Sequence, residues 1–354
     1  MTLYDSKLYM EDVANVAEID LPWELLQNKT VMLSGATGLI GSFLIDVILQ
    51  KNEISKLNCT VIALVRDIER AKERFHLFAD NSRLFFAKYD VREALVIDSF
   101  DRVDYVLHLA SNTHPLQYST DPIGTITTNI IGLQNMLEFS VENNVTRFVF
   151  ASSNEVYGEN RGDVEVFKEE YCGYIDSNTL RAGYPESKRC GEALCQAYKT
   201  QKSLNVVIPR FTRTYGPTMK KSDTKAISQF IKKGVAREDI VLKSEGFQYY
   251  SYQYVADSVS GLLTIVLRGE NGEAYNIAEE HSDIVLRDLA SIIAEMNNKS
   301  VVFEIPDAIE AAGYSTATKA RLDGNKLRNL GWNPAYRIEQ GVERTIKILR
   351  EVQL

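Results

Sequence analysis

KTVMLSGATGLIGSFLIDVIL, residues 29–49, places a short apolar run, a glycine-rich loop and a periodic apolar stretch in direct succession. The run at 29–33 fits a buried parallel strand, and the stretch after the loop fits a helix. Gly35, Gly38 and Gly41 lack side chains, which permits a tight turn and lets a pyrophosphate approach the helix N-terminus. A glycine turn without a ligand is the alternative. The order strand, glycine loop, helix favours a dinucleotide-binding loop.

Further apolar runs along the chain predict a sheet built around this first strand. They lie at residues 60–65, 84–89, 104–109, 146–151 and 204–210, and a long helix is expected at 120–140. Strands that are apolar throughout and alternate with helices are typical of a doubly wound parallel sheet. We therefore predict an α/β, Rossmann-type fold whose functional residues gather at the carboxyl ends of the strands.

The rest of the chain predicts a division into a leader and two domains. Residues 1–27 are expected to form a leader with one short helix. Residues 28–210 with about 248–282 are assigned to the dinucleotide-binding domain, because the apolar pattern of 249–267 predicts that this stretch returns to the sheet. A smaller C-terminal α/β substrate domain is assigned to residues from about 211 to 247 and from 283 to 354.

Composition excludes several classes of function. The 354 residues carry a net charge of -8, which argues against nucleic acid or an anionic membrane as the main partner. No apolar run approaches the roughly 20 residues that span a bilayer, and the polar, acidic N-terminus does not resemble a signal peptide. The four cysteines form no CxxC pair, so no metal site is expected. Reduced thiols fit a cytoplasmic enzyme.

RAGYPESKRCGEALCQAY, residues 181–198, contains the candidate acid/base. Tyr184 and Lys188 are four residues apart and share one face if the stretch is helical. An ammonium beside a phenol is expected to lower the phenol's pKa, so that the tyrosine exchanges a proton with an alcohol near neutral pH. Such a group suits a nicotinamide enzyme, in which hydride leaves or joins the same carbon. A pair of exposed surface residues is the alternative.

The residue after the second strand is expected to choose between NAD and NADP. An acidic residue there binds the ribose 2′-hydroxyl of NAD, whereas an arginine accommodates the 2′-phosphate of NADP. The run at 60–65 is followed by Arg66 and Asp67. Arg66 favours NADP over NAD, although the acidic Asp67 next to it fits NAD. The alternative role for Arg66 is to cap the next helix.

These motifs together resemble a known family. The glycine loop is followed by DVR at 90–92, HLAS at 108–111, SSNEVYG at 152–158 and YPESK at 184–188. In this order and at these intervals, they resemble the extended short-chain dehydrogenase/reductase family, which contains nucleotide-sugar epimerases, dehydratases and decarboxylases. The resemblance covers residues 29 to 346 and is greatest to UDP-glucuronate decarboxylases, whose active-site helix reads much like 181–198.

The resemblance implies roles for individual residues. Tyr184 would be the acid/base, Lys188 would bind the cofactor ribose, and Ser153 would hydrogen-bond the reacting hydroxyl. Glu155 matches a glutamate of dehydratases and decarboxylases, whereas Asn154 stands where dehydratases carry an aspartate and cannot donate a proton as an acid does. The predicted cofactor-binding residues are Gly35, Thr37, Gly38, Leu39, Ile40, Gly41, Arg66, Asp90, Val91, Leu109, Ala110, Ser111, Asn129 and Lys188.

The chain departs from the family pattern on the substrate side. Tyr250 stands where decarboxylases carry the arginine that recognises the sugar carboxylate, and a tyrosine cannot replace that bidentate contact. Arg213 replaces the family's asparagine in FTRTYGP, and Thr218 replaces an arginine. The substrate-binding prediction comprises Thr113, Arg213, Lys225 and Tyr250; Lys220 and Lys221 are further candidates for the diphosphate or belong to a solvated basic face.

Three functions remain open at this point. The first is a nucleotide-sugar epimerase, dehydratase or decarboxylase that regenerates a bound cofactor, which Glu155 favours. The second is an NADPH-dependent reductase of a nucleotide-activated keto sugar, which Arg66, Asn154 and the lost arginine at 250 favour. The third is a non-catalytic NADP-binding regulator. By resemblance, the protein is expected to be a homodimer with a nucleotide sugar as its partner.

Overall fold

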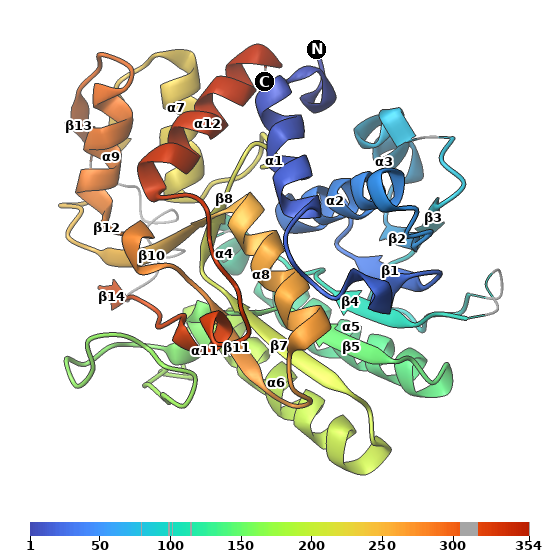
Figure 1. The fold of residues 1–354 in the computed structure, drawn as a ribbon. Helices are drawn as coiled ribbons and strands as arrows, with labels where there is room; N and C mark the ends of the chain where they lie inside the picture. The colour runs from blue at the N-terminus through green and yellow to red at the C-terminus, as the bar shows by residue number, and fades with distance from the viewer. Residues whose placement is uncertain (79, 98–99, 101, 114, 305–317, 354) are drawn as a thin grey trace.

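The computed structural model describes residues 1–78, 80–97, 100, 102–113, 115–304 and 318–353 and has a large parallel sheet at its centre (Figure 1). Its strands run in the order β11-β7-β5-β4-β1-β2-β3, β6 pairs with β7, and these neighbours are parallel. The bounds are β1 Thr30–Ser34, β2 Thr60–Val65, β3 Leu84–Lys88, β4 Tyr105–His108, β5 Arg147–Phe150, β6 Ser152–Ser153, β7 Val206–Phe211 and β11 Ala274–Ile277. The predicted doubly wound fold is confirmed.

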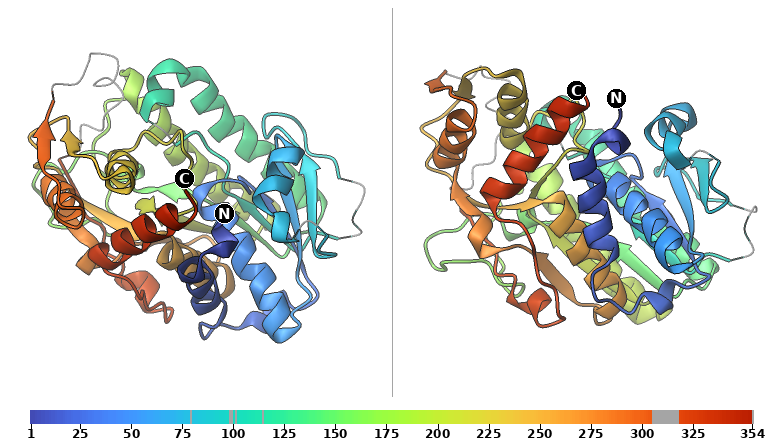
Figure 2. Two further views of the ribbon diagram at one scale, coloured as in Figure 1. Left: turned by 90° about the horizontal axis from the view of Figure 1, so that it is seen from above. Right: turned by 45° about the horizontal axis from the view of Figure 1, so that its top comes forward.

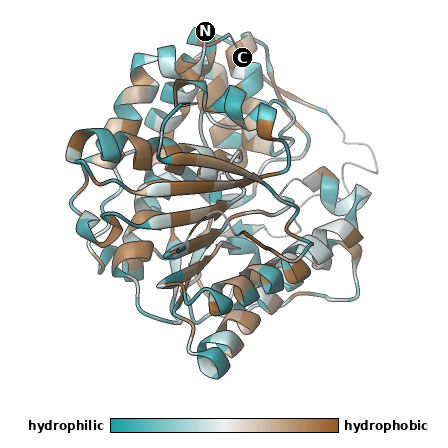
Figure 3. Cartoon of the chain, turned by 90° about the vertical axis from the view of Figure 1, so that its right-hand side faces the viewer, coloured by the Kyte–Doolittle hydropathy of each residue, from teal (hydrophilic) through white to brown (hydrophobic). Residues whose placement is uncertain are grey.

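Helices cover both faces of this sheet (Figure 2). Helices α2 (Leu39–Ser55) and α8 (Val255–Arg268) pack on one face, and α5 (Pro122–Glu142) and α6 (Gly183–Lys202) pack together on the other. Successive strand residues point to opposite faces of the sheet. Leu33 therefore lies in the hydrophobic core on the side of α2 and α8, and Met32 lies in the core on the side of α5 and α6. The strands are hydrophobic for most of their length because both faces are buried (Figure 3).

A second sheet lies beyond the carboxyl ends of the main strands. It contains β8 (Arg213–Tyr215), β10 (Tyr249–Tyr254), β12 (Asp283–Val285) and β14 (Lys319–Ala320), and β9 (Ile240–Leu242) pairs separately with β13 (Val301–Phe303). The expectation that 249–267 returns to the main sheet is therefore wrong for its strand: β10 pairs with β8, β12 and β14. Only α8 packs on the main sheet, and β11 supplies its edge strand, because an apolar strand pattern does not specify which sheet it joins.

The remaining elements fill the periphery. The helices are α3 Ile68–Arg74, α4 Pro115–Thr120, α7 Ala226–Ala236, α9 Leu286–Glu295, α11 Asn325–Arg328 and α12 Ile338–Glu351. The 3-10 turns are η1 Leu3–Asp5, η2 Trp23–Leu26, η3 His76–Phe78, η4 Asn154–Tyr157, η5 Leu180–Ala182 and η6 Glu280–Ser282. Within the described part of the chain, the helices are too short or too polar to traverse a lipid bilayer.

The N-terminal leader contains more than the one expected helix: two 3-10 turns flank α1 (Lys7–Ala17). Buried carboxylates anchor it on two sides. Asp12 of α1 accepts hydrogen bonds from the hydroxyls of Tyr254 in β10 at 2.5 Å and Tyr336 at 2.7 Å, and pairs with Arg344 of α12. Asp46 of α2 is bound by further leader side chains. The leader therefore connects the main sheet's helices to the second sheet.

Candidate active site

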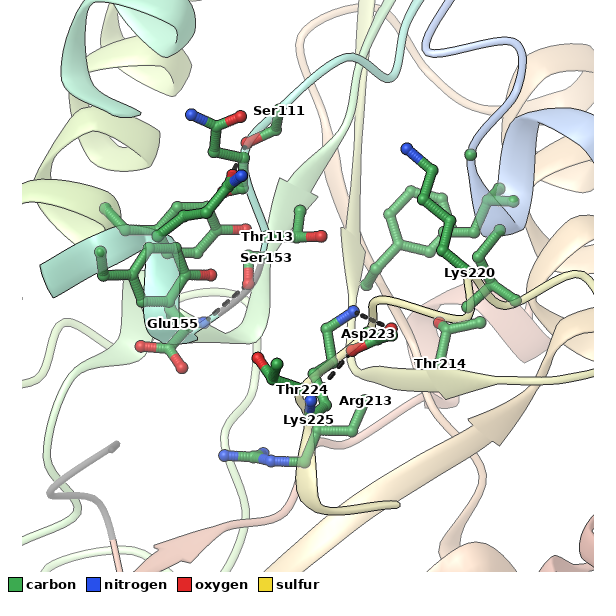
Figure 4. A pocket seen from close by; sticks show the side chains of 18 of the residues that line it. Ser111, Thr113, Ser153, Glu155, Arg213, Thr214, Lys220, Asp223, Thr224 and Lys225 are labelled. Carbon is green, nitrogen blue, oxygen red and sulfur yellow. Dashed lines mark hydrogen bonds and ion pairs between the residues drawn. The ribbon is translucent and has the colours of Figure 1, made fainter. Parts of the chain in front are cut away.

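One cavity of about 940 Å³ follows the carboxyl ends of the main strands and continues to the second sheet. Figure 4 shows side chains from both sheets facing it. Among the predicted site residues, those that line it are Gly35, Thr37, Gly38, Leu39, Ile40, Gly41, Arg66, Asp90, Val91, Leu109, Ala110, Ser111, Thr113, Ser153, Asn154, Glu155, Tyr184, Lys188, Arg213, Lys225 and Tyr250. Asn129 lies behind this lining. The fold thus brings the cofactor and substrate candidates into one space.

The glycine loop forms the cofactor end of the cavity. Gly35 has φ of 73°, and a Cβ there would lie 2.8 Å from the backbone nitrogen of Ala110. A Cβ on Gly41 would lie 2.4 Å from the carbonyl oxygen of Gly35. Gly38 caps α2 without a side-chain acceptor, so the first N–H groups of the helix are available to an anion. These features fit the pyrophosphate of a dinucleotide.

Basic side chains gather at the carboxyl end of β2, the position that contacts the adenosine ribose in dinucleotide-binding folds. Arg66 follows β2 and is exposed, whereas the Asp67 carboxylate caps α3 by accepting the backbone N–H of Arg70 at 3.1 Å. The helix cap is therefore Asp67, which leaves Arg66 on the cavity wall. Burial lowers the pKa of Lys220, and the nearby charges of Arg66 and Arg70 lower it further. Three cations thus approach one another here.

Tyr184 lies in the first turn of α6 and is only 6% exposed. Its ring stacks on Tyr118, with centroids 4.7 Å apart, and its hydroxyl lies close enough to the side chains of Ser153 and Tyr118 for both to influence its pKa. Burial raises the pKa of Tyr184 to about 12, and the Ser153 hydroxyl and the Arg181 charge act to lower it. Sequence reasoning missed Tyr118, because this tyrosine of α4 belongs to no motif.

Lys188 lies one turn further along α6 and is buried. Its ammonium donates to the backbone carbonyl of Ala151 at 2.8 Å and is 5.9 Å from the centroid of the Tyr184 ring. Burial lowers the pKa of Lys188 to about 7. The expected lowering of the Tyr184 pKa by Lys188 is not what these contacts produce, because desolvation of the phenol dominates.

Glu155 has a partner that the sequence motif did not reveal. Arg181 of η5 donates to its carboxylate at 2.7 Å, and the same guanidinium lies 4.8 Å from the centroid of the Tyr118 ring. Arg181 is three residues before Tyr184 in the chain, so the position was visible in the sequence but the pairing was not. Asn154, beside Glu155, is buried and lies near the Ser153 hydroxyl.

Asn129 of α5 lies behind the residues that line the cavity and contacts two of the segments that form it. Its side chain accepts a hydrogen bond from the Ser111 hydroxyl at 2.7 Å and donates to the Ser187 hydroxyl at 2.8 Å. Ser187 in turn donates to the backbone carbonyl of Tyr184. Asn129 thus connects the loop after β4 with the helix that carries Tyr184.

On the substrate side, Arg213 of β8 lies 3.4 Å from the centroid of the Tyr250 ring. Lys225 is paired with Asp223 at 3.2 Å. The hydroxyl of Thr218 donates to the carbonyl of Leu39 at 2.7 Å and so ties the second sheet's loop to the start of α2. Lys221 is exposed and does not line the cavity, so its position agrees with the alternative of a solvated basic face.

Comparison with known proteins identifies the family. The model of the NAD dependent epimerase/dehydratase family matches residues 31–278. The chain belongs to this family. UDP-glucuronic acid decarboxylase 1 of Xenopus tropicalis is 31% identical over 328 residues, which cover 91% of this chain and 72% of that protein. UDP-glucuronic acid decarboxylase 2 of Arabidopsis thaliana is 28% identical over 322 residues, with 91% and 68% covered.

Solved structures of the family share the fold. The dTDP-glucose 4,6-dehydratase of Streptomyces venezuelae, solved with NAD bound, has a TM-score of 0.77 at 25% identity, with 91% of this chain and 97% of that chain covered. The UDP-glucuronic acid 4-epimerase of Bacillus cereus has a TM-score of 0.76 at 20% identity, with 91% and 99% covered, and supports the fold alone. The predicted family, the extended short-chain dehydrogenase/reductases, is confirmed, and so is the predicted fold. The prediction of an enzyme that uses a nicotinamide cofactor is confirmed as well.

Proposed function

We propose that this enzyme modifies a nucleotide sugar by oxidising one sugar carbon transiently and reducing it again, as an epimerase, dehydratase or decarboxylase does. The observation that carries the proposal is the joint position of Tyr184, Ser153 and Glu155 in the cavity that the glycine loop opens onto. The second sheet supplies Arg213 and Tyr250 to the same cavity, which leaves room for a substrate beyond the cofactor. Relatives named for UDP-glucuronic acid and dTDP-glucose support a nucleotide-sugar substrate.

Each residue at the site has a separate role in this reaction. When bound, a nicotinamide supplies the hydride acceptor and donor. Ser153 holds the reacting hydroxyl beside Tyr184, which takes the proton as the alcohol is oxidised and returns it on reduction. Lys188, fixed by the Ala151 carbonyl, is placed to bind a ribose hydroxyl. Glu155, held by Arg181, is the base available to a neighbouring sugar position, and Asn154 beside it has no acidic proton to donate.

The cofactor that the protein retains tests this function. The purified chain is denatured, the released nucleotide is identified by chromatography, and the apoprotein is titrated with NAD, NADP and their reduced forms. Near-stoichiometric oxidised cofactor supports a cycle in which hydride returns to the substrate. An empty site that takes up free NADPH would instead identify a net reductase, and activated keto sugars would then be its substrates.

The second candidate, an NADPH-dependent reductase, is favoured by the basic side chains near Arg66. Arg70 and Lys220 add positive charge at the position where the 2′-phosphate of NADP would lie. We propose a preference for NADP on this ground, although the solved relative with 25% identity contains NAD.

Arg66→Ala is expected to weaken NADPH binding by about 10- to 100-fold and NADH binding far less, because a charge-assisted contact to the 2′-phosphate is lost. Fluorescence titration with both cofactors measures the two affinities. Lys72→Ala is the matched control, since Lys72 is on α3, exposed and paired with Glu69. Equal weakening of NADPH and NADH would show that Arg66 does not read the phosphate.

We further propose that the protein is a homodimer through α5 and α6. These helices pack against each other and leave apolar side chains outside: Ile123 is 75% exposed, and Leu180 just before α6 is 57% exposed. Light scattering should give about twice the 40.0 kDa of one chain. Ile123→Asp should shift the protein to monomer, whereas Ile54→Asp at an exposed site on α2 should not. A monomeric wild type would refute the proposal.

A further inference from the structure

Two arginines lie at the substrate end of the cavity. Arg181 and Arg213 come from η5 and β8, elements that are distant in sequence, and both line the space. Glu155 neutralises Arg181 through the 2.7 Å ion pair. Arg213 instead lies over the face of the Tyr250 ring, which attracts the cation but carries no negative charge to neutralise it. The pair thus retains positive charge.

Three of the guanidinium nitrogens lack acceptors. Nε and Nη1 of Arg181 and Nη1 of Arg213 are buried without a hydrogen-bond partner among the described residues. Buried charged donors that lose water and gain no acceptor are costly. An anion between the two side chains would offset that cost, since carboxylates and phosphates accept guanidinium N–H groups in pairs.

The position of this pair indicates which part of the substrate carries the anion. Burial raises the pKa of Tyr250, and the charges of Arg213 and Arg181 both lower it, so the two guanidinium groups face one region. The charge of Arg181 also lowers the pKa of Tyr184. In Figure 4, the Arg213 side chain extends to the side of the view on which Glu155 lies and away from Lys220. The unpartnered donors therefore lie on the Tyr184 side of the cavity, where the proposed function places the reacting sugar.

We propose that Arg213 and Arg181 recognise a carboxylate on the sugar, and that the substrate is a nucleotide-activated uronate. This inference rests on the proposed function and names its substrate class. It assigns carboxylate recognition to residues other than position 250, where this chain has a tyrosine. The geometry compensates for that tyrosine, because Arg213 places its guanidinium directly against the Tyr250 ring.

Calorimetry on the full chain with its cofactor tests the proposal. UDP, dTDP and GDP are titrated first, and the glucose and glucuronate conjugates of the tightest nucleotide follow. The wild type is expected to bind the glucuronate at least about tenfold more tightly than the glucose conjugate. Arg213→Gln should weaken the glucuronate by about 10- to 100-fold and leave the nucleotide and the glucose conjugate unchanged. Lys221→Gln, which removes an exposed charge outside the cavity, should alter none of them.

Each other outcome is decisive. Equal weakening of all three ligands by Arg213→Gln would show that Arg213 holds the diphosphate and would overturn the proposal. A wild type that does not prefer the glucuronate would overturn it while leaving the proposed function intact. If none of the nucleoside diphosphates binds, the proposed function fails and this inference fails with it. Thermal unfolding of each variant verifies that it is folded, and Arg213→Lys, which keeps the charge but loses the bidentate geometry, should fall between wild type and Arg213→Gln.

Discussion

Replacement of Tyr184 by phenylalanine is expected to reduce turnover at least about a hundredfold, the lower range for a positioned acid/base, while the protein stays folded and binds its cofactor. The ring keeps its stacking on Tyr118 at 4.7 Å, so packing is retained. Only the hydroxyl that meets Ser153 is removed. Because burial raises the pKa of Tyr184 to about 12, the phenol suits the return of the proton in the reduction step. Rates are measured with the nucleotide sugar that the wild type converts.

Tyr118→Phe is the matched control for this variant. It also removes one hydroxyl from the same stacked pair, but this hydroxyl is not the assigned acid/base, so its loss should cost much less turnover than that of the Tyr184 hydroxyl. If Tyr184→Phe turns over nearly as fast as wild type, the acid/base assignment is wrong. If the biological role survives in a catalytically inactive Tyr184→Phe variant, the alternative of a non-catalytic regulator gains the support that it now lacks.

Asp46→Ala is expected to lower the free energy of unfolding by about 3–5 kcal/mol, the cost of breaking a buried ion pair. The Asp46 carboxylate is 1% exposed, pairs with Arg74 at 2.6 Å and accepts hydrogen bonds from Tyr4 at 2.7 Å and from Tyr9. Its removal leaves the largely buried guanidinium and two hydroxyls without their shared acceptor. Urea unfolding followed by circular dichroism measures the loss.

Two variants separate this network from a general effect of charge removal. Asp20→Ala changes a fully exposed aspartate that pairs with Arg268 at 3.9 Å, and should leave the free energy of unfolding nearly unchanged. Asp46→Asn keeps the shape and part of the hydrogen bonding and should lose less than Asp46→Ala. Equal stability of Asp46→Ala and wild type would show that the leader is not anchored through this carboxylate.

Much of the fold could be predicted from residues 29–49 and from the spacing of the apolar runs. Strands β1 to β5 and β7 lie within one or two residues of their expected bounds. Local sequence is sufficient here because a strand buried on both faces must be apolar throughout, and a tight turn at positive φ, as at Gly35, requires glycine. The placement of β10 in a second sheet could not be predicted, since pairing partners far apart in sequence leave no local pattern.

The motifs of the sequence by itself determined the family, the glycine cradle and the joint presence of Tyr184, Lys188 and Ser153 near one strand end. Only the tertiary structure decided how the charges at the site are paired: Glu155 with Arg181, and Arg213 with the face of Tyr250. It also decided that burial, rather than Lys188, sets the pKa of Tyr184. The physical reason is that motifs follow backbone geometry, which is local, whereas ion pairs and desolvation depend on which distant segments close over a side chain.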